Sequence, residues 1–345
     1  MSGFITTFTP YFKKSVMREL QKVDKHIKAE LSVSDSVMLF SSSFEGYSFL
    51  KKLSESKPIF IKHICPADKA MKLSGELEQD RKDILEKLLK NDVKIEKGEK
   101  YSVQTRIFKA NAEYSAKDIE VFVGSHFEKL GGIPVFSKNK LTSDVNVKII
   151  SISIYKNDLY LGLSQASDNL NFDCDQYRIL SHGGREVSRA ENKLKEAIAK
   201  YGLSGKGKAL DIGAAPGGWS KVLLDAGYEV VAVDPGKLNE ELLKNPKLRH
   251  YKCRIEELSF DGEFNIITND MNVEPKVTGE IMNGLAHCLK DGGMAVVTLK
   301  LPGNPEKGVD EGVKELSKNY EVLFVNSLFH NRREVTALLR KNISK

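Results

Sequence analysis

The sequence predicts an α/β fold with a mostly parallel sheet in its second half, preceded by α+β structure in its first half. From Lys208 onward, short β-rich runs alternate with helical stretches. The runs are KALDIGA, YEVVAVD, FNIITND, MAVVTLK, YEVLFVN and EVTALLRK. Strands that alternate with helices form mostly parallel sheets that are covered on both faces. The length of 345 residues fits two or three domains, so the first half has room for a separate core.

The first half contains helices and strands without a regular alternation. Apolar periodicity predicts a helix at residues 13–23, then short strands at SVMLF and PIFIKHI, then a charged helix at about residues 75–91. A strand at YSVQTRIFKA, a helix at residues 116–130 and strands at VNVKIISISIYK and LYLGLSQA follow. Residues 167–187 are polar, lack periodicity and contain two adjacent glycines, which is typical of a linker.

Composition and cysteine usage exclude several classes of protein. Hydrophobic residues make up 41% and charged residues 29% of the chain, which is the balance of a globular protein. No apolar run approaches the roughly 18 residues that span a bilayer, and the N-terminus lacks the pattern of a secretory signal. The four cysteines (Cys65, Cys174, Cys253 and Cys288) have neither metal-ligand spacing nor the pattern of a disulfide framework. We therefore expect a cytoplasmic protein without a metal or a membrane partner.

The charge is unevenly distributed between the two halves. Residues 1–185 carry 29 Lys and Arg against 24 Asp and Glu, whereas the remainder carries 24 against 23. The basic excess of the first half is weak evidence for a nucleic-acid partner, and an ordinary solvated surface explains it equally well.

The segment LDIGAAPGGWS, residues 210–220, follows a predicted strand and opens a helix. Glycines at such a turn allow the backbone to approach a ligand closely. The segment is not GxGxxG, which argues against a dinucleotide site. The next strand ends at Asp234, 23 residues after Asp211, and an acid at this position commonly holds the ribose hydroxyls of adenosine-containing ligands.

The string DIGAAPGGWS resembles the cofactor loop of the FtsJ-like, or heat-shock RNA methyltransferase, family. The resemblance implies that the cofactor is S-adenosyl-L-methionine and that Asp234 holds its ribose. The positions expected to bind the cofactor are Ser188, Asp211, Gly213, Ala215, Pro216, Gly217, Gly218, Trp219, Asp234 and Asp270.

Four charged residues are candidates for catalysis. Asp270 and Lys300 end the strands FNIITND and MAVVTLK, and Lys193 lies in a helix that we expect to start at a capping box formed by Ser188 and Glu191. Sites in open α/β sheets form at the carboxyl ends of the parallel strands. Glu334 begins its strand, so it reaches that edge only if the strand runs antiparallel. In this order the four residues resemble the Lys-Asp-Lys-Glu tetrad of FtsJ-like 2′-O-methyltransferases, whose last strand is antiparallel.

Methyl transfer to a ribose hydroxyl needs a positioned oxygen and a group that removes its proton. A lysine crowded by a second cation suits this role because a like charge lowers its pKa. We assign Lys300 as the general base. Motifs of other methyltransferases are missing: the chain reads NDMNVEP where enzymes acting on base amino groups carry N/D-P-P-Y, and Cys253 and Cys288 lie away from the nucleophile position of cytosine-C5 enzymes.

The wider chain is similar to THUMP-containing, FtsJ-like large-subunit ribosomal RNA 2′-O-ribose methyltransferases. TLKLPGNPEK and FHNRREVTALLRK carry the resemblance in the second half, and FTPYFKKSVMRELQKV carries it at the start of the chain. The resemblance implies a ferredoxin-like domain at 1–95, a THUMP RNA-binding domain at 96–168, a linker at 169–187 and a Rossmann-like methyltransferase domain at 188–345. It implies structured, ribosomal RNA as the substrate. Arg254 stands where the family often has an acid that contacts the adenine, and the linker lacks the family's proline-rich run.

The sequence leaves three alternative functions open. THUMP domains occur mostly in enzymes that act on transfer RNA, so a transfer RNA 2′-O-methyltransferase is the second candidate. An RNA-binding or ribosome assembly factor without catalysis is the third, although it would have no use for an intact tetrad. A nicotinamide-dependent oxidoreductase is the most distant, because GxGxxG is missing.

Overall fold

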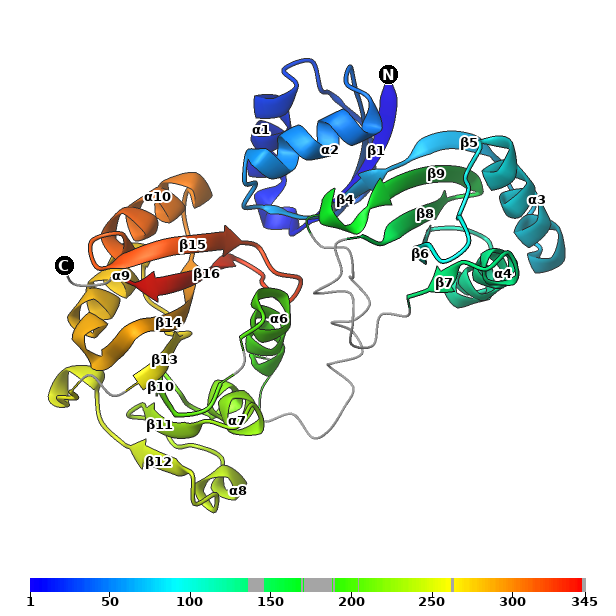
Figure 1. The fold of residues 1–345 in the computed structure, drawn as a ribbon. Helices are drawn as coiled ribbons and strands as arrows, with labels where there is room; N and C mark the ends of the chain where they lie inside the picture. Colours follow the sequence, from blue (N-terminus) through cyan, green and yellow to red (C-terminus); the bar gives the residue numbers. More distant parts are fainter. Residues whose placement is uncertain are drawn as a thin grey trace. The chain divides into compact units, whose positions relative to one another are not determined.

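The computed structural model describes residues 1–135, 146–168, 170, 188, 190–203, 205–261 and 264–342. The chain divides into two compact units, Met1–Gln176 and Tyr177–Lys345, and each is described by itself (Figure 1). The expected linker at 169–187 lies outside the described residues except for residue 170. No helix in the described ranges is both long and apolar enough to cross a bilayer.

The first unit begins with a four-stranded antiparallel sheet in the order β2-β3-β1-β4. Its elements are β1 (Ser2–Phe8), α1 (Lys13–Val23), β2 (Ala29–Ser34), β3 (Val37–Ser42), α2 (Gly46–Glu55) and β4 (Ile61–Pro66). The predicted helix at 13–23 is confirmed, and its residues Val16 and Leu20, one turn apart, are fully buried. Phe4, Phe40 and Phe49 pack against one another in the core beside this helix.

A second, five-stranded sheet in the order β5-β9-β8-β6-β7 completes the first unit. Its elements are β5 (Asp68–Lys72), α3 (Leu77–Lys90), β6 (Lys100–Phe108), α4 (Ala116–Lys129), β7 (Ile133–Pro134), β8 (Lys148–Tyr155) and β9 (Asp158–Gln165). Alternate residues of β8, namely Ile150, Ile152 and Ile154, pack in one core with α3 and α4. The expected domain boundary at residue 95 does not separate the two sheets, because β5 pairs with β9 and α3 packs on the second sheet.

The second unit contains a seven-stranded mixed sheet in the order β12-β11-β10-β13-β14-β16-β15. The strands are β10 (Lys208–Ile212), β11 (Glu229–Val233), β12 (Leu248–Tyr251), β13 (Phe264–Asn269), β14 (Leu289–Lys300), β15 (Tyr320–Asn326) and β16 (Glu334–Lys341). The helices are α6 (Glu191–Tyr201), α7 (Gly218–Asp225), α8 (Glu240–Leu243), α9 (Pro275–Gly284) and α10 (Pro305–Leu316). The first five strands of this order are parallel, and β16 is antiparallel to both β14 and β15, as predicted for the last strand.

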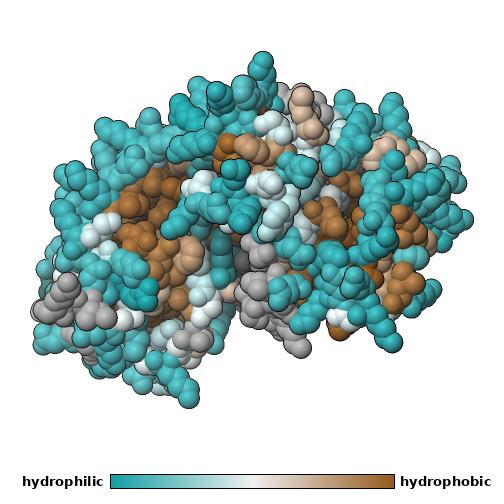
Figure 2. All heavy atoms as spheres, turned by 45° about the horizontal axis from the view of Figure 1, so that its top comes forward, coloured by the Kyte–Doolittle hydropathy of each residue, from teal (hydrophilic) through white to brown (hydrophobic). Residues whose placement is uncertain are grey.

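The strand order reverses at β10, whose two neighbours are β11 and β13. In open α/β sheets the crevice at this switch point, beyond the carboxyl ends of the strands, is where ligands bind. Ala209, Ile266 and Val296 lie at the centre of the sheet and are fully buried. Figure 2 shows apolar side chains between the mostly hydrophilic ones on the visible face. In the second unit the large exposed apolar side chains include Phe324 and Phe329.

Candidate active site

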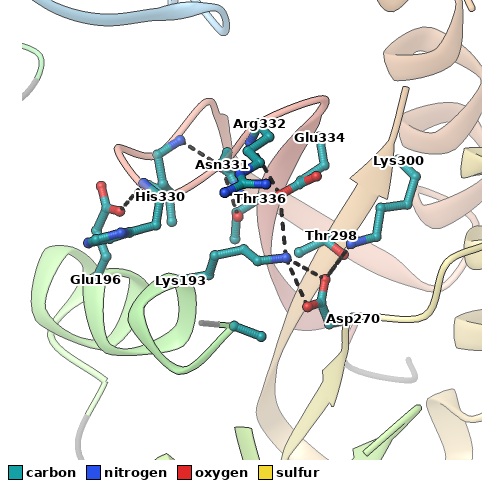
Figure 3. Close-up of polar contacts among 12 residues, drawn as sticks. Lys193, Glu196, Asp270, Thr298, Lys300, His330, Asn331, Arg332, Glu334 and Thr336 are labelled. Carbon is teal, nitrogen blue, oxygen red and sulfur yellow. Dashed lines mark hydrogen bonds and ion pairs between the residues drawn. The ribbon is translucent and has the colours of Figure 1, made fainter. Parts of the chain in front are cut away.

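Four charged side chains meet at the carboxyl edge of the second unit's sheet (Figure 3). The Nζ atom of Lys193 lies 2.9 Å from Oδ2 of Asp270 and 3.3 Å from Oε1 of Glu334. The Nζ atom of Lys300 lies 2.6 Å from Oδ1 of Asp270, and the hydroxyl of Thr298 donates to the same oxygen at 2.7 Å. Asp270 therefore lies between two ammonium groups, and the four residues selected from the sequence form one cluster, which we call the lysine–carboxylate cluster.

Strand register explains why these residues meet. Lys300 is the last residue of β14 and pairs directly with Glu334, the first residue of the antiparallel β16. Asp270 follows β13, which runs parallel beside β14. Lys193 lies in the first turn of α6, which begins at Glu191 with Ala190 as its N-cap. The expected start of this helix at Ser188 is therefore wrong, although the amide of Ser188 does donate to Glu191 at 3.3 Å.

Burial and charge act in opposite directions on the pKa values of this cluster. Burial lowers the pKa of Lys193, but the carboxylates of Asp270 and Glu334 outweigh it, so the pKa is raised above its ordinary value. Burial would raise the pKa of Asp270, and the charges of Lys193 and Lys300 lower it instead. The expected lowering of a lysine pKa by a like charge does not occur at Lys193, because the charges of Asp270 and Glu334 raise its pKa.

The loop between β10 and α7 turns through two glycines with left-handed backbone, Gly213 at φ 70° and Gly217 at φ 112°. The amides of this turn and the next are held by Asp234, which follows β11. Its Oδ2 accepts from the amide of Ala215 at 3.1 Å, and its Oδ1 accepts from that of Gly236 at 2.6 Å. Asp234 remains partly exposed at the edge of the sheet, so its carboxylate is accessible to a ligand beside the loop.

Two residues expected to bind the cofactor are instead enclosed by the protein. Asp211 lies within β10, is 1% exposed and accepts hydrogen bonds from Ser220 at 2.6 Å and Thr268 at 2.8 Å. Its burial raises its pKa to about 7. Trp219 is 3% exposed, and its indole N–H donates to the carbonyl of Ala190 at 2.8 Å. Asp211 joins β10 to α7 and β13, and Trp219 joins α7 to the start of α6, so both side chains leave little surface for a ligand.

Small residues are required where α7 begins. A Cβ atom added to Gly218 would lie 2.2 Å from the hydroxyl oxygen of Ser188, so a larger residue there would displace this serine. Ser188 therefore packs against the start of α7, next to the loop. This contact joins the segment that precedes α6 to the predicted cofactor loop.

Sequence reasoning missed Glu196, which is completely buried on α6, one turn after Lys193. Its carboxylate accepts from the backbone amides of Phe329 at 2.6 Å and His330 at 3.0 Å. These contacts fasten α6 to the segment between β15 and β16, which leads to Glu334. The spacing of Lys193 and Glu196 by three residues, which places them on one side of a helix, was the available signal.

A hollow of about 460 Å³ lies beside the lysine–carboxylate cluster. It is lined by Ala190, Asn192, Lys193, Phe329, His330, Asn331, Arg332 and Glu334. Because its lining includes Lys193 and Glu334, a molecule bound there would contact the lysine–carboxylate cluster. In the described part of the chain, no group of three or more His, Cys, Asp or Glu side chains is placed to hold a metal ion.

Comparison with known proteins identifies the domain that carries this site. Residues 186–301 match the model of the FtsJ-like methyltransferase family. The chain is 29% identical over 168 residues to an uncharacterized protein of Methanocaldococcus jannaschii, which covers 46% of this chain and 47% of that protein. It is 33% identical over 176 residues to the ribosomal RNA large subunit methyltransferase M of Shewanella denitrificans. This match covers 44% of this chain and 46% of that protein.

The enzyme of the same name from Marinomonas is 27% identical over 200 residues, which covers 52% of this chain and 55% of that protein. The chain thus spans about half the length of the curated relatives that it matches. The matched segment contains β10, the loop that follows it, Asp270 and Lys300. The second unit therefore contains an FtsJ-like methyltransferase domain with an α/β methyltransferase fold.

Proposed function

We propose that this protein is an S-adenosylmethionine-dependent RNA 2′-O-ribose methyltransferase that acts on large-subunit ribosomal RNA. The observation that carries the proposal is the lysine–carboxylate cluster at the carboxyl edge of a methyltransferase domain. Such a cluster supplies what transfer to a hydroxyl requires, which is a proton acceptor and charges that orient it. The names of the relatives support ribosomal RNA as the substrate.

The residues of the cofactor loop fit S-adenosylmethionine. The backbone of residues 215–218 would contact the cofactor, and the partly exposed carboxylate of Asp234 would accept hydrogen bonds from its ribose hydroxyls. When bound, the cofactor supplies an electrophilic methyl group. Asp270 lies next to Asn269 at the end of the neighbouring strand, on the same edge of the sheet.

We assign different roles to the two lysines because their partners differ. Lys193 contacts two carboxylates and its pKa is raised, so it stays charged and holds Asp270 and Glu334 in position. Lys300 has an ion pair only with Asp270 among the described residues, so one carboxylate holds it in place, and we assign it as the general base. In its neutral form Lys300 would accept the proton of the 2′-hydroxyl as this oxygen takes the methyl group, and the electron pair of the broken carbon–sulfur bond would stay on the cofactor's sulfur.

The first unit would bind the RNA. Its first sheet has the βαββαβ order of ferredoxin-like domains, and we assign the second sheet, with α3 and α4, as a THUMP domain. The basic excess of residues 1–185 favours contacts to phosphates. Specificity for the target would then reside in the methyltransferase domain, because contacts to phosphates do not read sequence.

The test compares Lys300→Ala with Lys307→Ala, which alters an exposed lysine on α10 that pairs with Glu311. Transfer of a labelled methyl group is measured on large-subunit ribosomal RNA and on transfer RNA, and the product is checked for resistance to alkaline cleavage at the modified ribose. Lys300→Ala should reduce the rate by about 10²–10⁴-fold with unchanged cofactor affinity, and Lys307→Ala should not. Near-full turnover of Lys300→Ala would refute the assignment, and preferred transfer to transfer RNA would refute the substrate.

A further inference from the structure

We infer that residues 327–333, which we call the β15–β16 loop, form a binding site for one unstacked nucleotide of single-stranded RNA. The inference deepens the proposed function, because it names the part of the substrate that enters the hollow beside Lys193 and the side chains that hold it. Two features carry it: buried side chains hold the loop's backbone in place, and its outward side chains include an aromatic ring and a cation.

The first inner fastening is Glu196. Its side chain is completely buried, and its two carboxylate oxygens each accept one backbone amide of the loop, from Phe329 and His330. A buried carboxylate is costly unless hydrogen bonds satisfy it, so this arrangement holds the backbone at a defined place above α6. In Figure 3 the loop runs from Glu196 on one side of Lys193 to Glu334 on the other.

The second inner fastening is Asn331, which is 2% exposed. Its Oδ1 accepts from the amide of Leu328 at 2.7 Å and from the hydroxyl of Thr336 at 3.2 Å. Leu328 is itself fully buried in the core of the second unit. The loop is therefore attached to α6, to β16 and to the core, so its outward side chains project from a preorganised backbone.

The outward side chains suit a nucleotide. Phe329 is 38% exposed and lines the hollow together with Arg332, which is exposed and has no ion pair with another described residue. Splayed bases of single-stranded RNA stack on aromatic rings, and a guanidinium binds a phosphate through two parallel hydrogen bonds. A hollow of about 460 Å³ lies in the size range of small-ligand sites.

The position of the hollow requires an unstacked nucleotide. Lys193 and Glu334 belong both to its lining and to the lysine–carboxylate cluster. A nucleotide whose base lies on Phe329 and whose phosphate lies on Arg332 brings its ribose toward this cluster. An RNA duplex keeps its bases stacked inside the helix, so it cannot place one base against the loop without opening.

The experiment measures binding of the full-length chain, without cofactor, to a fluorescein-labelled single-stranded RNA of about ten nucleotides, and to a hairpin duplex of the same composition. The loop variants are Phe329→Leu and Arg332→Gln. The matched controls are Phe324→Leu, an exposed phenylalanine on β15 that stacks on Tyr201, and Arg340→Gln, a surface arginine paired with Glu321. Each loop variant should weaken binding of the single strand about 5- to 50-fold, and each control should stay within about twofold.

Salt dependence separates the two contributions. Arg332→Gln should reduce the slope of log Kd against log salt by about 0.7, which is the value for one phosphate contact on a single strand. Phe329→Leu should leave the slope unchanged, since stacking releases no counterion. Binding of the duplex should change less than binding of the single strand in both loop variants.

The outcomes distinguish this inference from the proposed function. Wild-type-like binding by both loop variants, or failure of the wild-type chain to bind the single strand, would overturn the nucleotide site, even if methyl transfer occurs. Loss of single-strand binding in the loop variants, together with absence of methyl transfer by the wild-type chain, would uphold the site and refute the proposed function. Thermal unfolding of each variant shows whether a loss of binding reflects a loss of fold.

Discussion

Glu196→Ala is expected to destabilise the second unit by several kcal/mol, although residue 196 is neither in the cluster nor in the predicted cofactor loop. The substitution leaves the amides of Phe329 and His330 without their acceptor. A buried donor that loses its partner costs about 1–3 kcal/mol, so the pair costs about 2–6 kcal/mol. This is a large part of the total stability of about 5–15 kcal/mol that is typical of a domain.

Glu196→Gln is the graded companion variant. Its amide oxygen still accepts from Phe329, but its amide nitrogen meets the N–H of His330, so one donor remains unsatisfied instead of two. The cost should be about 1–3 kcal/mol. The expected order of stability is therefore wild type, then Glu196→Gln, then Glu196→Ala.

The assay is urea unfolding followed by tryptophan fluorescence. Trp219 is the only tryptophan of the chain and is buried in the core of the second unit, so the signal reports that unit alone. With a denaturant dependence of about 2 kcal/mol per molar urea, the midpoint should fall by about 1–3 M for Glu196→Ala. Glu311→Ala is the control, because Glu311 is an exposed helical glutamate with a surface ion pair. A midpoint for Glu196→Ala within about 0.3 M of the control would refute the reasoning.

Three further predictions concern the edge of the sheet. Asp270→Asn should lower the pKa of Lys193, because burial then acts against one carboxylate instead of two; titration of lysine side-chain carbon resonances checks this, and an unchanged titration would contradict it. Asp234→Ala should weaken S-adenosylmethionine binding by about 10- to 150-fold, the equivalent of a charge-assisted hydrogen bond of about 1.5–3 kcal/mol, and calorimetry that shows equal affinity would remove Asp234 from the site. The pKa of Asp211 is about 7 in the folded chain, above its unfolded value, so its contribution to stability is complete below about pH 4 and is lost as the pH rises through about 7. Asp211→Asn should remove this loss, which amounts to at most about 4 kcal/mol. If the change in unfolding midpoint between pH 5 and pH 8 is the same for the variant as for the wild type, the prediction is contradicted.

The membership of the lysine–carboxylate cluster could be predicted from the sequence. Asp270 and Lys300 end neighbouring parallel strands, and the carboxyl ends of such strands always meet at one edge of the sheet. Glu334 followed from the antiparallel direction expected of the last strand, which the register of β14 with β16 confirms. The alternation of strands and helices predicts the parallel strands, whereas the direction of the last strand was implied by the resemblance to FtsJ-like enzymes.

Other features depend on contacts between residues far apart in the chain, which local patterns do not report. The predicted boundary at residue 95 assigned α3 to the first domain, because α3 follows that domain's strands directly in the chain. In the structure β5 pairs with β9, some 90 residues later, and α3 packs on the second sheet. Trp219 belongs to a loop motif, and only its packing in the core shows that it supports the loop from within.

Glu196 illustrates the difference most clearly. In the sequence it is one of several charged residues of an amphipathic helix, where a charge is usually solvated. In the fold it is fully buried and joins α6 to amides 133 residues away. The pattern of apolar residues determined that α6 forms and which face it buries. Only the tertiary structure decided which charged side chain on its flank would be enclosed, because that depends on where the β15–β16 loop closes over the helix.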